Sequence, residues 1–134
     1  MPTDYKYTDI DIDFNKNSFT DDFSLMHDRN AVRQSIMNIV LTRKGEKPFN
    51  RSFGIGLHDL LFENLSPTDI SRLEMDIKEQ VTAREPRAVV SSVKVNDSQI
   101  DINNLTINIT YRVISGPTAE PILDSLQIEI AKVR

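Results

Sequence analysis

The chain lacks cysteine and long apolar runs, and each absence excludes a class of protein. None of its 134 residues is cysteine, so disulfides and thiolate metal sites cannot form, which fits a reducing compartment. No apolar stretch approaches the roughly 20 residues that a membrane-spanning helix needs. The opening segment, "MPTDYKYTDIDIDF", is acidic where a secretory signal would be basic and then apolar. We therefore expect a soluble protein that is made in a cytoplasm and has no membrane partner.

An excess of positive charge is also missing. The formal net charge is −4 and the sequence pI is about 5.1, so a broad basic face for nucleic acid is not expected. The only histidines, His27 and His58, have no second histidine at helical spacing, and we expect no metal site and no cofactor. A composition of 39% hydrophobic and 27% charged residues is that of a folded globular domain.

The pattern divides the chain into two parts. Residues 1–27 are polar, rich in Asp and Asn, and contain scattered aromatic residues without a helical or strand period. We interpret them as an extended N-terminal arm whose aromatic side chains pack against another surface. Residues 28–134 are predicted to form a single α+β domain, because helical periodicity is followed by alternation that is typical of strands.

Two main helices and a short one are predicted. Val32, Ile36, Ile39 and Val40 form the apolar stripe of a helix from about Arg29 to Lys44. Asp28 or Asn30 is expected to cap its start, Arg43 and Lys44 to lie in its last turn, and Gly45 to take the left-handed cap.

The second main helix has the clearer boundaries. Ser66 is the expected cap, Pro67 the first helical residue, and Asp69 lies near the positive helix end. An apolar face follows and the helix must stop before Pro86. Between the two helices, residues Leu57 to Phe62 are predicted to form one or two helical turns.

After Pro86 the period changes to two, which predicts three strands. The first contains Val89, Val93 and Val95 on one face, and Asn96 to Ser98 form a turn. The second alternates cleanly, with a bulge or turn tip expected at Asn103 and Asn104 before it. Its apolar positions are Leu105, Ile107, Ile109, Tyr111 and Val113. The third alternates Leu126, Ile128 and Ile130 with Gln127 and Glu129. We predict a small, mainly antiparallel three-stranded sheet with the helices packed on one face.

The Gly54-Ile55-Gly56 segment raises the possibility of a phosphate-binding loop. A dinucleotide fingerprint would need a preceding strand and a third glycine, but a turn precedes this segment and Asp59 occupies the third position. We interpret Gly54 and Gly56 as residues that permit a tight connection, which places Leu57 and its neighbours against the core.

More distinctive is the stretch "REPR", residues 84–87, between the second helix and the first strand. Pro86 is rigid, so Glu85 and Arg87 can project to roughly the same side as a fork of opposite charges. Arg87 would bind a carboxylate or main-chain carbonyls, and Glu85 would accept amides or a partner arginine. The alternative is a helix stop with a surface salt bridge worth under about 1 kcal/mol.

The residues allow three further hypotheses about function. A small sheet has edges that can accept a strand from another chain, and the last strand, with Leu126, Gln127, Ile128, Glu129 and Ile130, is the candidate. A hydrolase would need two carboxylates in a cleft, and Glu46, Asp59 and Glu63 are the available ones. A generic adaptor that uses the arm is a third hypothesis.

With these residues set out, the chain resembles a known family. "TRKGEKPFNRSFGIGLHDLLFENLSP" (Thr42 to Pro67) followed by Glu85-Pro86-Arg87 is similar to the short baseplate-wedge, or sheath-initiator, proteins of contractile-tailed bacteriophages. Their relatives occur in the baseplates of type VI secretion systems. The opening "YTDIDIDF" (Tyr7 to Phe14) resembles the T4-like branch, whereas Ile55 and Gly56 lie where relatives vary.

The resemblance implies a non-enzymatic structural protein of the virion tail, assembled in the host cytoplasm. In the family, the Glu-Pro-Arg triplet contacts the helical bundle of the large wedge proteins, a role that carries over to Glu85, Pro86 and Arg87. The small sheet is similar to the interlocking part of a sheath subunit, so strands of the tail sheath protein would add to it. An old lysozyme label attaches to some members, and no residue pattern here supports it.

Overall fold

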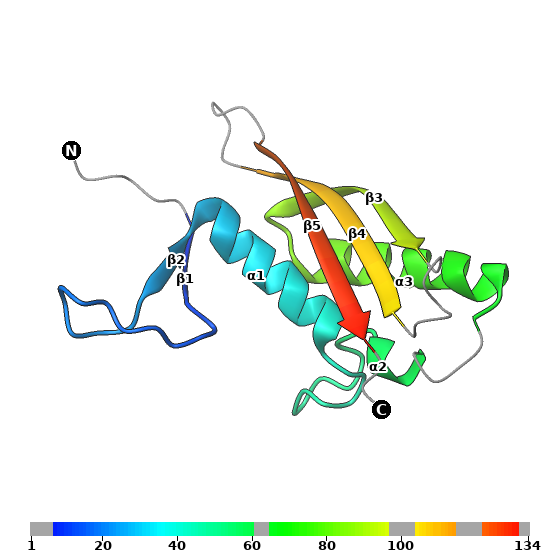
Figure 1. Cartoon of the computed structure of the whole chain (residues 1–134), viewed down its shortest axis with the longest axis horizontal. Helices are drawn as coiled ribbons and strands as arrows, with labels where there is room; N and C mark the ends of the chain where they lie inside the picture. Colours follow the sequence, from blue (N-terminus) through cyan, green and yellow to red (C-terminus); the bar gives the residue numbers. More distant parts are fainter. Residues whose placement is uncertain (1–6, 61–64, 97–103, 115–121, 132–134) are drawn as a thin grey trace.

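The computed structural model describes residues 7–60, 65–96, 104–114 and 122–131. Its elements follow the chain in this order: β1 (Thr8–Ile10), β2 (Leu25–His27), α1 (Asp28–Leu41), α2 (Leu57–Leu60), α3 (Pro67–Arg84), β3 (Ala88–Asn96), β4 (Asn104–Val113) and β5 (Ile122–Ala131). The strands β3, β4 and β5 form an antiparallel sheet in that order, and α1 and α3 pack against it (Figure 1). The predicted α+β architecture is confirmed.

The helix α3 has the predicted start and end. The Ser66 side chain accepts a hydrogen bond from the Asp69 amide at 3.2 Å, and the Asp69 carboxylate accepts one from the Ser66 amide at 3.0 Å. This reciprocal pair satisfies two amides that the helix itself leaves without partners. At the other end Glu85 is the last cap residue, and Pro86 prevents a further turn. Leu73, Ile77 and Val81 are buried on the face toward the sheet.

The helix α1 is shorter than the sequence pattern predicts. It ends at Leu41 because Thr42 is extended. The Thr42 carbonyl accepts a hydrogen bond from the Ile55 amide at 3.1 Å. Arg43 and Lys44 therefore lie beyond the helix, and the prediction that they occupy its last turn is wrong. Gly45 does have a positive φ of 85°, but in the following turn.

The predicted cap of α1 is wrong as well. His27 is the N-cap residue and its side chain makes no capping bond. The side chain of Asp28 instead accepts a hydrogen bond from the Tyr7 amide at 3.0 Å, which ties the start of α1 to the N-terminal segment.

In the sheet, β4 and β5 confirm the predicted alternation. The predicted apolar residues of both strands are buried, and Ile107 and Ile109 are fully inaccessible. Tyr111 is also buried, and its hydroxyl donates to Asp124 at 2.8 Å. Burial, and then the bond to Asp124, raises the pKa of Tyr111. The polar end of this side chain therefore adds no unsatisfied group to the core.

Strand β3 departs from the simple alternation. The register shifts between Val90 and Ser92, which marks a bulge. Val90 is buried and Val89 is exposed, so the prediction that Val89 shares a face with Val93 and Val95 is wrong. Of the predicted turn, Asn96 is the last residue of β3 and pairs with Thr106, whereas Asp97 and Ser98 fall outside the described residues. Asn103 also falls outside them, and Asn104 begins β4.

The glycine segment connects the loop after α1 to the core, as predicted. Gly54 has a φ of 95°, and a Cβ atom there would lie 2.3 Å from the Thr42 carbonyl oxygen. Ile55 and Leu57 on either side of Gly56 are buried in the core. Only glycine fits this close approach to the end of α1. The predicted short helix is present as α2, and Leu61 and Phe62 lie outside the described residues.

The N-terminal segment folds back on itself. Strands β1 and β2 pair antiparallel, with Asp9 opposite Met26. We call residues 7–27 the arm and residues 28–131 the body. Figure 1 shows the arm projecting from the start of α1, away from the three-stranded sheet. The division of the chain into arm and domain remains a prediction.

Candidate protein-interaction sites

The Glu85-Pro86-Arg87 segment connects α3 to β3 and forms a closed ion pair. The Arg87 guanidinium donates to both carboxylate oxygens of Glu85, from Nε and from Nη2, each at 2.7 Å. The predicted fork thus closes on itself, because Pro86 brings the two side chains together. The Glu85 side chain is 2% exposed and that of Arg87 26% exposed. Glu85 is therefore directed inward, and Arg87 retains an accessible side.

Burial of Glu85 changes the energetics of the pair. Burial opposes ionisation of Glu85, but side-chain hydrogen bonds from Arg87 and Ser35 outweigh it and lower the pKa of Glu85. The hydrogen bonds from Arg87 to Glu85 raise the pKa of the guanidinium. Both groups are charged. Removal of one member would leave the other buried and unpaired, at a cost of about 3 kcal/mol. Of the alternative, the helix stop and the salt bridge are both present, but the pair is not a surface one, because Glu85 is buried.

The arm reaches this ion pair through Tyr7. Its ring lies under the Arg87 guanidinium, with 5.4 Å between the guanidinium carbon and the ring centroid. Its hydroxyl donates to the Ile114 carbonyl at 2.7 Å, and the Ile114 amide donates to the Arg87 carbonyl at 2.9 Å. Arg87 is thus oriented by Glu85 and by Tyr7. The sequence pattern did not predict the contribution of Tyr7, which lies far from Arg87 along the chain.

A hollow of about 610 Å³ lies beside this site along α1. Its floor contains Ser35, Asn38 and Thr42, and Phe53 and Arg84 line it as well. Arg84 donates to the Ser52 hydroxyl at 2.9 Å and lies over the Phe53 ring. The two arginines of the "REPR" stretch therefore have different surroundings, since Arg84 holds the loop and Arg87 pairs with Glu85.

The two edges of the sheet differ. On the outer edge of β3, the Val95 amide donates to the Glu74 carboxylate of α3 at 2.9 Å. On the outer edge of β5, no described residue supplies a hydrogen-bond partner to the backbone. Leu126, Ile128 and Ile130 are buried, and Gln127 and Glu129 are exposed and bonded to each other at 2.8 Å. The predicted strand therefore lies at an open margin of the described fold.

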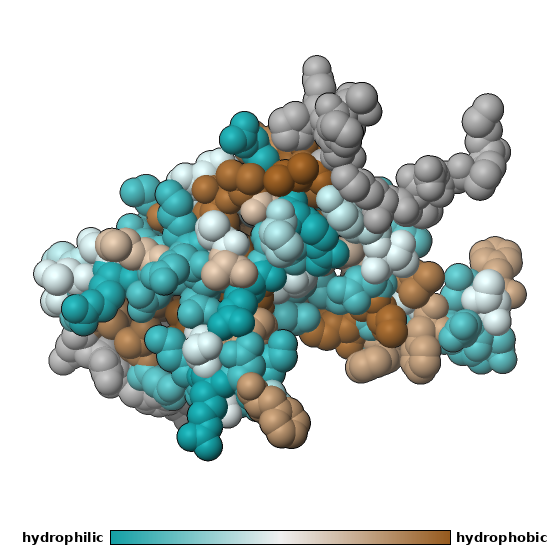
Figure 2. Space-filling model, turned by 180° about the vertical axis from the view of Figure 1, so that it is seen from behind, coloured by the Kyte–Doolittle hydropathy of each residue, from teal (hydrophilic) through white to brown (hydrophobic). Residues whose placement is uncertain are grey.

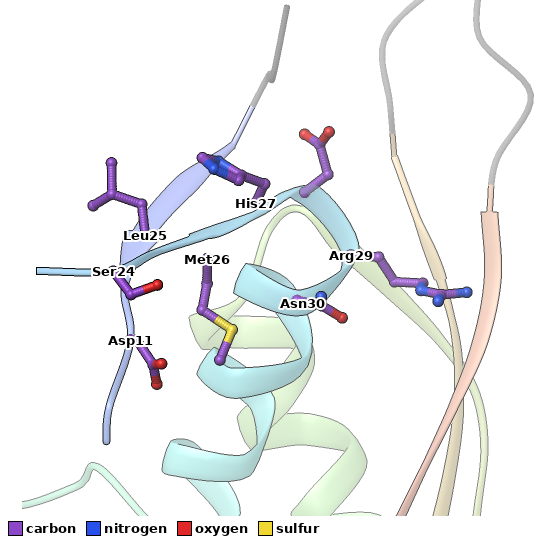
Figure 3. Close-up of a pocket in the computed structure, with 8 residues that line it drawn as sticks. Asp11, Ser24, Leu25, Met26, His27, Arg29 and Asn30 are labelled. Atoms are coloured by element: carbon purple, nitrogen blue, oxygen red, sulfur yellow. The ribbon is translucent and has the colours of Figure 1, made fainter. Parts of the chain in front are cut away.

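A second hollow, of about 500 Å³, lies where the arm meets the first turn of α1. Figure 3 shows Asp11 and Ser24 next to each other on the arm, and Arg29 extending away from them toward the sheet. Asp11 is buried and accepts from the Asp13 amide and the Asn15 side chain. These contacts indicate that Asp11 organises a turn of the arm.

Among the described residues, no three His, Cys, Asp or Glu side chains form a group that could hold a metal ion. No described helix is long and apolar enough to cross a membrane. Of the carboxylates considered for hydrolysis, Glu46 accepts from the Arg43 amide of its own turn at 2.9 Å, Asp59 is exposed, and Glu63 falls outside the described residues.

Comparison with known proteins identifies the family of the chain. The family model described as baseplate wedge protein gp25 matches residues 26–118. The chain belongs to this family. The baseplate wedge protein gp25 of Enterobacteria phage T4 is 34% identical over 112 residues, which cover 83% of each chain. The protein is thus a structural component of a contractile-tail baseplate.

Solved structures show the same fold. A chain of the anti-feeding prophage baseplate, solved with six-fold symmetry, aligns with a TM-score of 0.69 and 25% identity, covering 84% of this chain and 88% of that one. A Geobacter sulfurreducens protein named provisionally as a tail lysozyme aligns with a TM-score of 0.59 and 28% identity, covering 77% and 91%. Residues 1–25, which include most of the arm, lie outside the range of the family match.

Proposed function

We propose that this protein is a scaffold of the baseplate wedge that offers the outer edge of β5 to the first ring of the tail sheath. It is anchored to the helical bundle of the large wedge proteins through Arg87, with Glu85 and Pro86, and it joins the virion tail during assembly in the host cytoplasm. The observation that carries the proposal is the contrast between the closed edge at β3 and the open edge at β5.

The register identifies the backbone groups of β5 that an added strand could bond to. The Val95 amide faces Glu74, so Lys94 and Asn96 face β4, where they pair with Asn108 and Thr106. Ile107 and its neighbour Ile109 must then face β5, which directs the backbone of Ile128 and Leu126 inward. The outward groups of β5 therefore belong to Ser125, Gln127 and Glu129. An added strand would bond to these residues and would leave the core side chains in place.

The anchor rests on Arg87. Its guanidinium is held by two hydrogen bonds from one side, so a partner carboxylate or helix C-terminus can meet it without the entropy cost of ordering a free side chain. Glu85 acts as the residue that positions Arg87, because it is itself buried. Pro86 is exposed and lies next to it.

A single proline tests the edge. Gln127→Pro removes an outward amide without breaking the ladder to β4, so baseplates should assemble and sheath polymerisation should stall. Gln127→Thr is the matched control, because it also removes the bond to Glu129 but keeps the amide. Electron microscopy of tails from phage that carry each variant is the measurement. Normal sheathed tails with Gln127→Pro would contradict strand addition at this edge.

Paired alanines test the anchor. Glu85→Ala combined with Arg87→Ala removes both charges together, so no buried charge is left unpaired. We expect incorporation into purified wedges to fall at least about tenfold, which corresponds to about 1.4 kcal/mol. Arg84→Ala, which changes the neighbouring arginine, should incorporate normally. Circular dichroism of each variant establishes that the fold is retained, and normal incorporation of the folded double variant would contradict the anchor.

We infer that the protein is not a hydrolase. A muramidase-like reaction would need two carboxylates positioned across a cleft, and Glu46 is hydrogen-bonded within its own turn. A peptidoglycan turbidity assay with the purified protein should show no clearing. Clearing that disappears in Glu46→Gln or Glu63→Gln would contradict this inference.

A further inference from the structure

The arm is ordered by backbone hydrogen bonds. Beyond the β1–β2 pairing, the Asp11 amide donates to the Ser24 carbonyl at 3.1 Å, and the Ser24 amide donates to the Asn15 carbonyl at 2.7 Å. At the tip the Asn17 amide donates to the Asp22 carbonyl at 2.8 Å. The arm thus has a defined shape, although few of its side chains are buried.

Its large apolar side chains are exposed, although the rings of Phe14 and Phe23 contact each other edge to face, with centroids 5.9 Å apart. Phe19 is 99% exposed and Phe14 is 67% exposed. The exposed apolar residues of the arm are Ile10, Ile12, Phe14, Phe19, Phe23 and Leu25. Figure 2 shows apolar side chains gathered at the end of the molecule that carries the arm. Exposed apolar residues that are scattered singly are ordinary, whereas several on one short segment indicate an interaction surface.

The base of the arm is fixed to the body. Gln34, which is buried on α1, donates to the Ile10 carbonyl at 2.8 Å and accepts from the Ile12 amide at 3.0 Å. This side chain therefore occupies the free edge of β1 as a neighbouring strand would. Tyr7 and Asp28 bond to each other through two amides, at 2.8 and 3.0 Å. The apolar residues are thus presented in a fixed direction, which lowers the entropy cost of binding.

The arm also carries the charge of the protein. Residues 1–27 contain six of the 20 acidic residues and two of the 16 basic ones, so they account for the whole net charge of −4. Residues 28–134 contain the other 14 acidic and 14 basic residues, so together they are formally neutral. A surface that combines exposed aromatics with excess carboxylates is complementary to a groove that is apolar at its floor and basic at its rim.

We propose that residues 10–25 form a second docking surface, separate from Arg87 and from β5, whose partner is a basic, apolar groove on a different protein of the baseplate wedge, since the relatives of this chain are baseplate proteins. A second copy of this chain is a poorer match. Its body has no net positive charge, and its own arm would repel the first. A preformed acidic hairpin that inserts aromatics into such a groove would fix the direction in which the protein sits.

The test compares exposed aromatics inside and outside the arm. Phe14→Ser combined with Phe19→Ser removes two arm side chains, and Phe49→Ser removes an equally exposed phenylalanine of the loop after α1. Full-length variants would be titrated against two probes from the same phage: wedges assembled without this protein, and purified sheath protein. We expect at least a tenfold loss of affinity for the wedge probe with the arm variant, and less than a twofold change with Phe49→Ser.

Charge is tested separately. Asp13→Asn combined with Asp22→Asn should weaken binding to the same probe and reduce its dependence on salt between about 50 and 300 mM, because fewer charges are screened. Unchanged affinity of the aromatic variant for the wedge probe, or a loss for the sheath protein alone, would overturn the proposal. So would self-association of the purified protein, seen by sedimentation, that the aromatic variant abolishes. Loss of the anchor in the Glu85 and Arg87 variant would leave the arm's salt dependence in place, so the two proposals fail independently.

Discussion

The arm and the body are held together by opposite means. In the body, apolar residues of α1, α3 and all three main strands point inward and form one core. In the arm, the backbone is hydrogen-bonded while phenylalanine and isoleucine side chains face solvent. The body is therefore stabilised by burial of apolar side chains, whereas the arm is an extension ordered by backbone hydrogen bonds. The free energy of unfolding should therefore depend on the body, and binding should depend on the arm.

The largest expected effect is on the core. Ile107→Ala removes a fully buried side chain from the central strand and should lower the free energy of unfolding by about 4 kcal/mol, through lost burial and a residual cavity. Urea denaturation measures it. Ile12→Ala, in the arm, is the matched control and should cost less than about 0.5 kcal/mol. Equal losses at the two positions would show that arm and body share one core.

The buried ion pair should give the next largest effect, and one that depends on pH. Glu85→Gln leaves Arg87 without a counter-charge and should cost about 3 kcal/mol at neutral pH. The pKa of Glu85 is lowered below its ordinary value of 4.5, so the stability that it supplies is present above pH 4.5 and is lost as the pH falls through the folded-state pKa. The difference between wild type and variant should therefore shrink in acid.

Unfolding curves between neutral pH and pH 3 check this prediction. Glu79→Gln, an exposed change on the same helix, is the control and should show no such convergence. A difference that grows in acid would contradict the direction of the shift.

Release of the arm should be a smaller and local event. Gln34→Ala removes the two hydrogen bonds to the backbone of Ile10 and Ile12 and should cost about 1 kcal/mol. Hydrogen exchange should become about tenfold faster at the Ile12 amide and stay unchanged at Ile107. Gln80→Ala is a suitable control, because the side-chain oxygen of Gln80 accepts no hydrogen bond within the described chain. Faster exchange across the whole sheet would show that the arm stabilises the body.

The smallest effect is expected at Tyr7. Tyr7→Phe loses the bond to the Ile114 carbonyl but keeps the ring under Arg87, so the cost should be below about 1 kcal/mol. Thermal unfolding measures it. A decrease in the free energy of unfolding above about 2 kcal/mol would contradict this separation, since it would show that arm and body unfold as one cooperative unit.

Features that depend on close neighbours in the chain were predictable from the sequence. The capping box of α3 involves residues three positions apart, and the alternation in β4 and β5 follows directly from strand geometry. Gly54 could be predicted to permit a tight connection, because few other residues tolerate its backbone angle. The family, too, was predictable, since each segment that carries the resemblance is a continuous stretch of the sequence.

Other features depended on contacts between distant parts of the chain. The end of α1 is decided by Ile55, which takes the Thr42 carbonyl, and the inward direction of Glu85 depends on burial and on Ser35 of another helix. Tyr7 and Ile114 are 107 positions apart. The bulge in β3 places Val89 on the exposed face, although strict alternation with Val93 and Val95 would place it on the buried one.

The sequence by itself therefore determined the helices and main strands of the body, the apolar faces of α1, α3, β4 and β5, and the family of this protein. Only the tertiary structure decided which polar groups are occupied and which remain open for partners. The physical reason is that helix and strand patterns arise from interactions within a few residues, whereas the closure of an ion pair or of a sheet edge requires a donor and an acceptor that the fold brings together.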